Sequence, residues 1–415
     1  MASIRVLDAA GRAMQRLGYL KYLARRVSVV DTSSLDNLGR DLIDAVTKRV
    51  RAPVTGERAT YVRRRLTDRA YDDLKKRLAG WSEGEDRVLS MEMQDLYLSD
   101  PGLPSQTGKL VRDDWRRYPP LAVTLGLVRA GTYSANTRAM SLLHLTPKVE
   151  LQAFSDYDAH ANPLRLSREQ ALLLLYSFLE NDAEVICPLL AELSGHRGDA
   201  FTDRDVGQRL PGILRGVISR HRLRPVSAEQ RERLEVLSHV AVSIEKWRDR
   251  SYSGGGADIE ASRPRVEPYV DIGLFSKPDS FKYAYTVTTA GMVWAEALRT
   301  FDDGGDVAAF LSERFFGTAA RACRVAAIPI GDRDAVVRQS YRAWEAIRSA
   351  GGYAPIEEIA LLAGIHALCQ DGLILESAVV RDALISYQRE HPYQVRFSVN
   401  RMGALANARF VEEPG

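Results

Sequence analysis

Apolar residues recur at helical spacing through most of this chain, and stretches with strand alternation are short. Residues 166–193 form the most apolar of the helical stretches, which predicts a central core helix. The same spacing predicts further helices over residues 3–27, 35–50, 60–78, 85–98, 109–127, 227–250, 332–349, 356–368 and 377–390. The pattern therefore predicts a mainly α protein with short β-hairpins.

One short phrase occurs twice, 147 positions apart, as Leu125-Gly126-Leu127-Val128 and as Ile272-Gly273-Leu274-Phe275. In each copy a polar stretch follows, then a segment rich in Tyr and Thr, then a helical stretch that opens on Thr. A glycine directly after a helical stretch commonly ends the helix. Each copy therefore predicts a helix, a two-stranded hairpin and a new helix, in that order.

A third and less similar hairpin is predicted near the C-terminus. Residues 394–399 alternate at strand period, residues 400–403 form a turn and residues 409–411 return. Three predicted helices precede this hairpin, and His391-Pro392 stops the last of them.

This order of elements resembles the winged helix-turn-helix superfamily. The resemblance implies that the helix before each hairpin enters the major groove of DNA, while the hairpin, or wing, touches the backbone or the minor groove. Pro119-Pro120 and Pro268 lie in two of these helices, which predicts that both helices are short or broken. The residues that the resemblance assigns to DNA are Lys109, Arg112, Arg116, Arg117, Tyr133, Asn136, Arg263, Arg265, Lys277, Lys282, Arg396, Asn400 and Arg401.

Charge is unevenly placed along the chain. The formal net charge is only +3, but residues 1–80 carry 18 Lys and Arg against 9 Asp and Glu. Such asymmetry favours a basic segment that binds a polyanion, although the same charges could simply be solvated. We therefore expect a basic helical arm (1–80), a winged-helix module (81–160), a helical core with a second module (161–300) and a winged-helix-like third module (301–415).

The cysteines and the hydropathy pattern indicate a cytoplasmic protein. Cys187, Cys323 and Cys369 are far apart and odd in number, which argues against a disulfide framework. No apolar run approaches the roughly 18–20 residues of a membrane helix, and the N-terminus lacks the pattern of a signal peptide. We expect no membrane partner.

Residue patterns typical of enzymes are mostly missing from the sequence. The His and Cys residues show no metal-ligand spacing. Residues 102–109 depart from a phosphate-binding loop by one extra residue, and Leu110 stands where Ser or Thr would hold magnesium. Pro278-Asp279 is too close to Lys282 for the site of a restriction-type nuclease. We expect no catalytic residues, no metal and no cofactor.

These observations favour a non-catalytic DNA-binding subunit that uses tandem winged helices on duplex DNA. Such a subunit would work with a separate ATPase or nuclease in bacterial DNA defence or maintenance. One alternative is a scaffold whose winged helices dock partner subunits, as in SMC-associated proteins. A second alternative is a divergent restriction-type nuclease.

Overall fold

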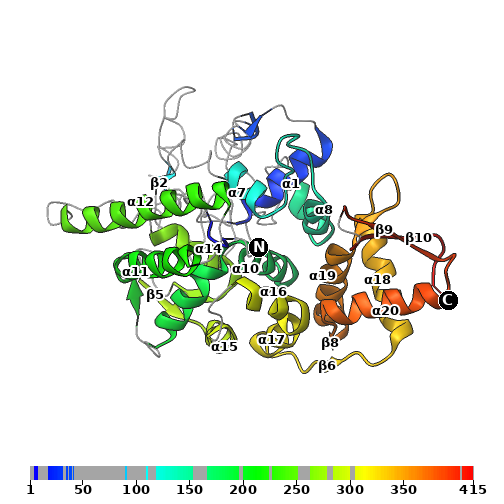
Figure 1. Ribbon diagram of the computed structural model, residues 1–415. Helices are drawn as coiled ribbons and strands as arrows, with labels where there is room; N and C mark the ends of the chain where they lie inside the picture. Colours follow the sequence, from blue (N-terminus) through cyan, green and yellow to red (C-terminus); the bar gives the residue numbers. More distant parts are fainter. Residues whose placement is uncertain are drawn as a thin grey trace, which may run out of the picture.

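The computed structural model describes residues 4–7, 17–30, 34–35, 37–39, 41, 89–90, 109–110, 118–152, 166–195, 200–223, 227–250, 262–277, 284–299, 304–401 and 404–414. Within these residues the protein is mainly helical, and its short strands form small sheets that are antiparallel except for one pair (Figure 1). The predicted fold class, mainly α with short β-hairpins, is confirmed.

Helix α10 (Arg168–Ser194) is the central helix that the apolar stretch predicts. Ser167 and Gln170 form a capping box at its start, so the first backbone N–H groups are satisfied. Most of its side chains are buried, because α11, α14, α15 and α16 of the middle unit and α19 of the C-terminal unit pack against it. In Figure 1 it lies in the middle of the molecule, with the C-terminal elements on one side and the long helix α12 projecting on the other.

The first unit of the structure contains α1 (Tyr19–Val29), α7 (Tyr118–Thr124), α8 (Thr137–His144) and α9 (Lys148–Gln152). Helix α1 packs against α7 and α8, and its Leu20 and Leu23 are fully buried. This part of the predicted arm is thus integrated into the body of the protein. Residues 4–7 have no regular structure, although a helix is predicted there, and residues 42–80 lie outside the described residues.

A short antiparallel pair occurs within the ranges of two predicted helices, 85–98 and 109–127. Strand β1 (Leu89–Ser90) pairs with β2 (Lys109–Leu110). The helix predicted over residues 109–127 is therefore confirmed only for its last part, as α7. Two adjacent prolines near the start of α7 explain why it is short, since proline cannot donate to the helix ladder.

The middle unit comprises α10, β3 (Phe201–Thr202), α11 (Asp203–Arg222), α12 (Ala228–Arg250), the 3₁₀ turn η2 (Arg263–Arg265), α14 (Glu267–Ile272), β4 (Phe275–Ser276), β5 (Ala284–Val287), α15 (Thr289–Leu298), α16 (Gly304–Glu313) and α17 (Phe315–Ala322). Its sheet has the strand order β3-β5-β4. Helices α11 and α12 pack along each other as a hairpin.

The repeated phrase forms the same hydrogen-bonded turn in both units. Gly126 and Gly273 end α7 and α14 in the left-handed region, with φ of +73° and +90°, where glycine is favoured. The amide of the following leucine, Leu127 or Leu274, donates to the carbonyl five residues earlier at 2.8 Å in both copies. This is the Schellman pattern of a helix C-terminus, and it confirms the helix end predicted for each copy.

The second half of the phrase is also equivalent. Asn136 and Thr288 cap α8 and α15 with their side chains, and their amides donate to Leu127 and Leu274 respectively, at 3.0 Å in both. The hairpin between cap and glycine is a single bridge, Val128 to Ala135, in the first unit and the β4–β5 pair in the second. The predicted order of helix, hairpin and helix is confirmed in full for the second copy. In the first copy the two helices are present, and the predicted two-stranded hairpin is reduced to one bridge.

The C-terminal unit comprises α18 (Arg333–Ile347), β7 (Ala354–Pro355), α19 (Ile356–His366), the π-helical turn η3 (Ala367–Asp371), α20 (Ser377–Glu390), β9 (Val395–Val399) and β10 (Leu405–Phe410). Its sheet has the strand order β7-β10-β9, and its core is largely separate from that of the other units. All three predicted helices and the predicted hairpin are present. Strand β7 and the parallel pair of β6 (Ile328–Pro329) with β8 (Leu373–Ile374) were not predicted.

Gly364 on α19 allows the C-terminal unit to approach α17 closely. A Cβ at this position would lie 2.2 Å from Cε2 of Phe316 and 2.7 Å from the carbonyl oxygen of Leu375. Because one of these neighbours is backbone, the packing cannot adjust through side chains alone.

Gly364→Ala is expected to lower the free energy of unfolding by about 1–3 kcal/mol through overpacking, measured as a lower thermal unfolding midpoint. Gly212→Ala on α11 is the matched control, because a Cβ there meets nothing within 4 Å. That control should gain up to about 1 kcal/mol, because alanine is the better helix former. Equal midpoints for the two variants would show that the contact between α17 and α19 has room for a methyl group at position 364.

Candidate functional site

The β9–β10 hairpin separates apolar from polar side chains between its two faces. Val395 and Phe410 are paired across the strands and buried against the helices of the C-terminal unit. Successive strand residues point to opposite faces. The residues that alternate with the buried ones therefore form a polar face on the other side of the hairpin. We call this set the polar wing face; its members are Arg396, Ser398, Asn407 and Arg409.

Arg396 and Arg409 are direct cross-strand partners on the polar wing face. Both side chains are exposed, and neither forms an ion pair with any carboxylate of the described chain. Residues 391–411 contain no Asp or Glu, and Glu390, just before them, pairs with Arg333. Like charges directly opposite each other destabilise a ladder, so the hairpin holds a positive pair with no internal counter-charge.

Neighbouring residues support this arrangement. The guanidinium of Arg409 lies 5.9 Å from the ring centroid of Tyr353, within cation–π range. Gly352, with φ of +76°, leaves room for it, because a Cβ there would lie 3.2 Å from Nε of Arg409. On the same face, Asn407 Nδ2 donates to Ser398 Oγ at 2.8 Å. The polar wing face is thus a row of donor-bearing side chains.

The turn of this hairpin carries the two other predicted DNA contacts of the C-terminal unit. Asn400 closes the turn, because its Oδ1 accepts from the amide of Ala404 at 3.0 Å and its amide donates to the Ala404 carbonyl at 2.8 Å. Arg401 is exposed in the turn. The structure therefore places the predicted residues Arg396, Asn400 and Arg401 on one hairpin.

The first unit keeps two of its predicted contacts near the surface. Tyr133 is half-buried with φ of +49°, and Asn136 is half-buried as the cap of α8. Lys109 is on strand β2 and not on the predicted helix. The remaining predictions are not described by the structure: Arg112, Arg116, Arg117 and Lys282 lie outside the described residues, as do the side chains of Lys109 and Arg263.

Two predicted DNA contacts, Arg265 and Lys277, are wrong because both side chains are buried in ion pairs. Lys277 Nζ lies 3.0 Å from Glu267 Oε1, and both side chains are fully buried. Tyr285 OH donates to the same oxygen at 2.7 Å. Arg265 donates to Asp182 on α10 and to the carbonyl of Leu7. A phosphate on the surface cannot reach either cation, so both serve the core of the middle unit.

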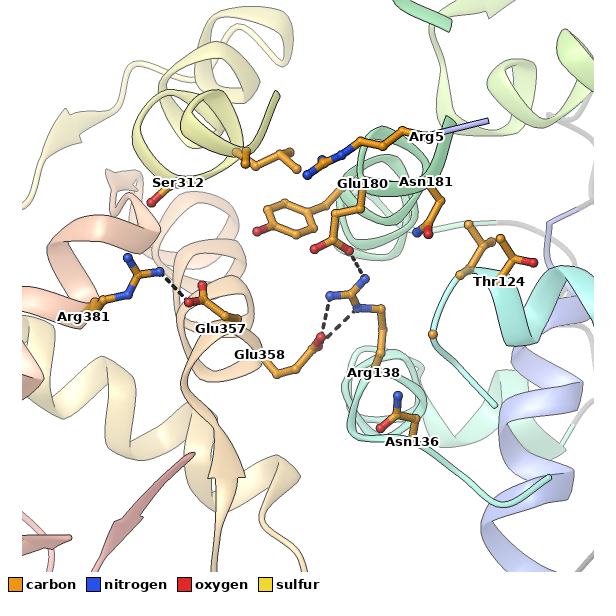
Figure 2. A pocket seen from close by; sticks show the side chains of 15 residues that line it. Arg5, Thr124, Asn136, Arg138, Glu180, Asn181, Ser312, Glu357, Glu358 and Arg381 are labelled. Carbon is orange, nitrogen blue, oxygen red and sulfur yellow. Dashed lines mark hydrogen bonds and ion pairs between the residues drawn. The ribbon is translucent and has the colours of Figure 1, made fainter. Parts of the chain in front are cut away.

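A second polar site is a cavity where the first unit, α10, α16 and the C-terminal unit meet (Figure 2). At its centre Arg138, from α8, donates to Glu180 on α10 and to Glu358 on α19. Burial by itself lowers the pKa of Arg138, but Glu358 and Glu180 raise the pKa above its ordinary value. Burial raises the pKa of Glu180, and Arg138 partly offsets this. Arg138 thus joins three helices from separate parts of the chain.

Sequence reasoning missed Arg409 as a DNA contact and did not bring the charged residues of the cavity together. A signal for Arg409 was present, because the predicted return strand through residues 409–411 places it opposite the first strand of the hairpin. No comparable signal exists for Arg138, whose partners are 42 and 220 positions away. Contacts of that range depend on how the helices pack.

The described residues hold no group of three or more His, Cys, Asp or Glu side chains arranged for a metal ion. Cys187 is buried on α10, and burial raises the pKa of its thiol. Among the described helices none combines the length and the apolarity that crossing a bilayer requires. No protein-family model matches this chain, and comparison with curated proteins and with solved structures gives no match either.

Proposed function

We propose that this protein is a non-catalytic DNA-binding subunit that contacts the phosphates of duplex DNA with the polar wing face of its C-terminal unit. The observation that carries the proposal is the exposed cross-strand pair of Arg396 and Arg409, which has no carboxylate partner. Phosphate oxygens are the counter-charges that arginine recognises best, through paired donors. A bound backbone would remove the repulsion between the two guanidiniums.

The order of elements in the C-terminal unit supports a winged-helix relationship. Three helices, α18, α19 and α20, precede a two-stranded hairpin, which is the order that the resemblance implies. In winged helices the hairpin touches the DNA backbone or the minor groove. The polar wing face is therefore in the part of the unit where backbone contacts are expected.

The helix before the hairpin carries balanced charge. Arg381 of α20 pairs with Glu357, and the exposed Arg389 is accompanied by the exposed Asp382 and Glu390. Base edges are read mostly by residues of such a helix, whereas phosphate contacts position the protein without reading sequence. A basic hairpin beside a charge-balanced helix favours binding that tolerates many DNA sequences.

The middle unit has a different role in this proposal. Its corresponding helix α14 is short, and Glu267, Pro268 and Tyr269 on it are buried against the core. This favours a structural role for the middle unit over a role in binding DNA. The partner ATPase or nuclease, and the part in bacterial DNA defence or maintenance, stay predictions from the sequence.

The double substitution Arg396→Gln/Arg409→Gln tests the proposal. We expect affinity for a labelled duplex to fall at least ~10-fold, and the slope of log K against log salt to shrink by about two, since each lost phosphate contact contributes about 0.9. Fluorescence anisotropy at several salt concentrations measures both quantities.

The matched control is Arg204→Gln/Arg222→Gln, which removes the same charge from two exposed positions of α11. This control should bind with nearly the affinity of the unmodified protein. An equal loss in both double variants would show that only net charge matters and would overturn the assignment to the hairpin. No binding by the unmodified protein at ~50 mM salt would favour the scaffold alternative, because phosphate contacts are strongest at low salt.

A further inference from the structure

The cavity around Arg138 has the size of a small-molecule site and is separate from the polar wing face. Its volume is about 550 Å³, within the range of roughly 300–1,000 Å³ that is common for ligand pockets. Its walls come from the N-terminal segment, the α7–α8 turn, α10, α16, α19 and α20. Figure 2 shows the charged side chains of these elements directed toward one another.

The lining carries both signs of charge in equal number. Three guanidiniums, of Arg5, Arg138 and Arg381, face three carboxylates, of Glu180, Glu357 and Glu358. Arg138 is saturated by two carboxylates, and Arg381 pairs with Glu357. Two interactions with Arg138 and one with Arg381 therefore account for all three carboxylates.

Arg5 is the guanidinium left over. It forms no ion pair within the described part of the chain, although its positive charge is near enough to lower the pKa of Glu180, against the effect of burial. In Figure 2 its side chain extends along the cavity on the side of Glu180. The backbone at Arg5 is fixed in position, because its amide donates to Glu184 at 2.8 Å and the next residues, Val6 and Leu7, are buried.

Two carboxylate oxygens are also left over. Glu180 accepts from Arg138 through Oε2 alone, and Glu357 accepts from Arg381 through Oε1 alone. The second oxygen of each is available to a donor in the cavity. The site thus offers one cation without a counter-ion and, on other elements, two acceptors with negative charge.

We propose that this cavity binds a small zwitterion, with an anionic group on Arg5 and a cationic amine on Glu180 or Glu357. A ligand with only negative charge would meet three carboxylates, and one with only positive charge would meet three guanidiniums. Like-charge juxtaposition opposes both. A molecule that carries both charges can pair with the cation and with a carboxylate at the same time. Amino acids and short peptides are molecules of this kind.

Thermal unfolding of the full chain with defined probes tests this inference without any DNA. The probes are the common α-amino acids and dipeptides made from them, at millimolar concentration. Carboxylates, amines and pyrophosphate serve as analogues that carry charge of one sign only. At least one zwitterion should raise the unfolding midpoint, and the rise should grow with the logarithm of its concentration once the site is mostly occupied. The analogues with charge of one sign should leave the midpoint unchanged.

Arg5→Gln should remove the response to that zwitterion, because the anionic group loses its counter-charge. Glu357→Gln should weaken the response, because one of the two acceptors for the amine is lost. Both variants keep the Arg138 ion pairs. Arg231→Gln, exposed on α12, should keep the full response. The proposal is overturned if no zwitterion shifts the midpoint, if pyrophosphate alone shifts it, or if the response persists in both cavity variants. Because the readout contains no nucleic acid, its failure leaves the test of the polar wing face unaffected.

Discussion

Lys277→Glu is expected to leave the protein unfolded or aggregated, although the position looks like an ordinary wing lysine in the sequence. The change places a second carboxylate beside Glu267, where both side chains are fully buried. Removing one partner of a buried pair costs about 3–5 kcal/mol, and a buried like charge adds to this. Because folded proteins are stable by only about 5–15 kcal/mol in total, soluble yield and far-UV circular dichroism should both show the loss.

The control is the double variant Lys277→Met/Glu267→Gln, which removes both charges and keeps the approximate volumes. Replacing a buried ion pair with neutral residues is often nearly neutral in stability, so this protein should fold and bind DNA with little change. A folded Lys277→Glu protein with reduced DNA affinity would instead show that the side chain of Lys277 lies on the surface. That result would support the sequence-based prediction that Lys277 contacts DNA.

The sequence was sufficient for those elements whose boundaries are set by local chemistry. The helix predicted over residues 377–390 is α20 with the same bounds, because His391-Pro392 stops it at one end. The two copies of the repeated phrase end their helices at Gly126 and Gly273, where a positive φ is needed. Such signals lie within a few residues of the element that they determine.

The direction of charged side chains was less predictable. Arg265 precedes a predicted wing and Arg396 lies within one. Arg265 pairs with Asp182 inside the core, whereas Arg396 is exposed. The difference depends on Asp182, which is 83 positions from Arg265 and comes from another helix. Hydropathy alone cannot distinguish a cation that meets a buried carboxylate from one that meets solvent.

The two candidate sites differ in the same way. The polar wing face is local, since strand alternation and a short turn bring Arg396 opposite Arg409. The cavity collects Arg5, Glu180 and Glu357 from three distant segments through helix packing. We therefore regard hairpin sites as accessible to sequence reasoning and junction sites as a product of the tertiary fold.

Arg138→Met is expected to destabilise the protein by about 3 kcal/mol at neutral pH, because it leaves Glu180 and Glu358 without their cation. We place the loss at the lower end of the range for buried pairs, since about a third of the Glu180 side chain is exposed. The midpoint of thermal unfolding should fall accordingly. Glu180→Gln/Glu358→Gln in the Arg138→Met background should recover most of the loss, because neutral amides need no counter-ion.

The destabilisation should also depend on pH, which separates lost charge pairing from lost packing. Burial already raises the pKa of Glu180 above its ordinary value of 4.5, and Arg138 partly offsets the rise. Without Arg138 the pKa of Glu180 in the folded state rises further above its value in the unfolded state. The variant therefore keeps its full stability below the unfolded-state pKa and loses it as pH rises through the folded-state pKa. The gap in unfolding midpoint between Arg138→Met and the unmodified protein should therefore be largest near pH ~8 and narrow toward pH ~5. A gap that stays constant across this window would mean that Arg138 stabilises the junction through its packing on Tyr176 and not through its charge.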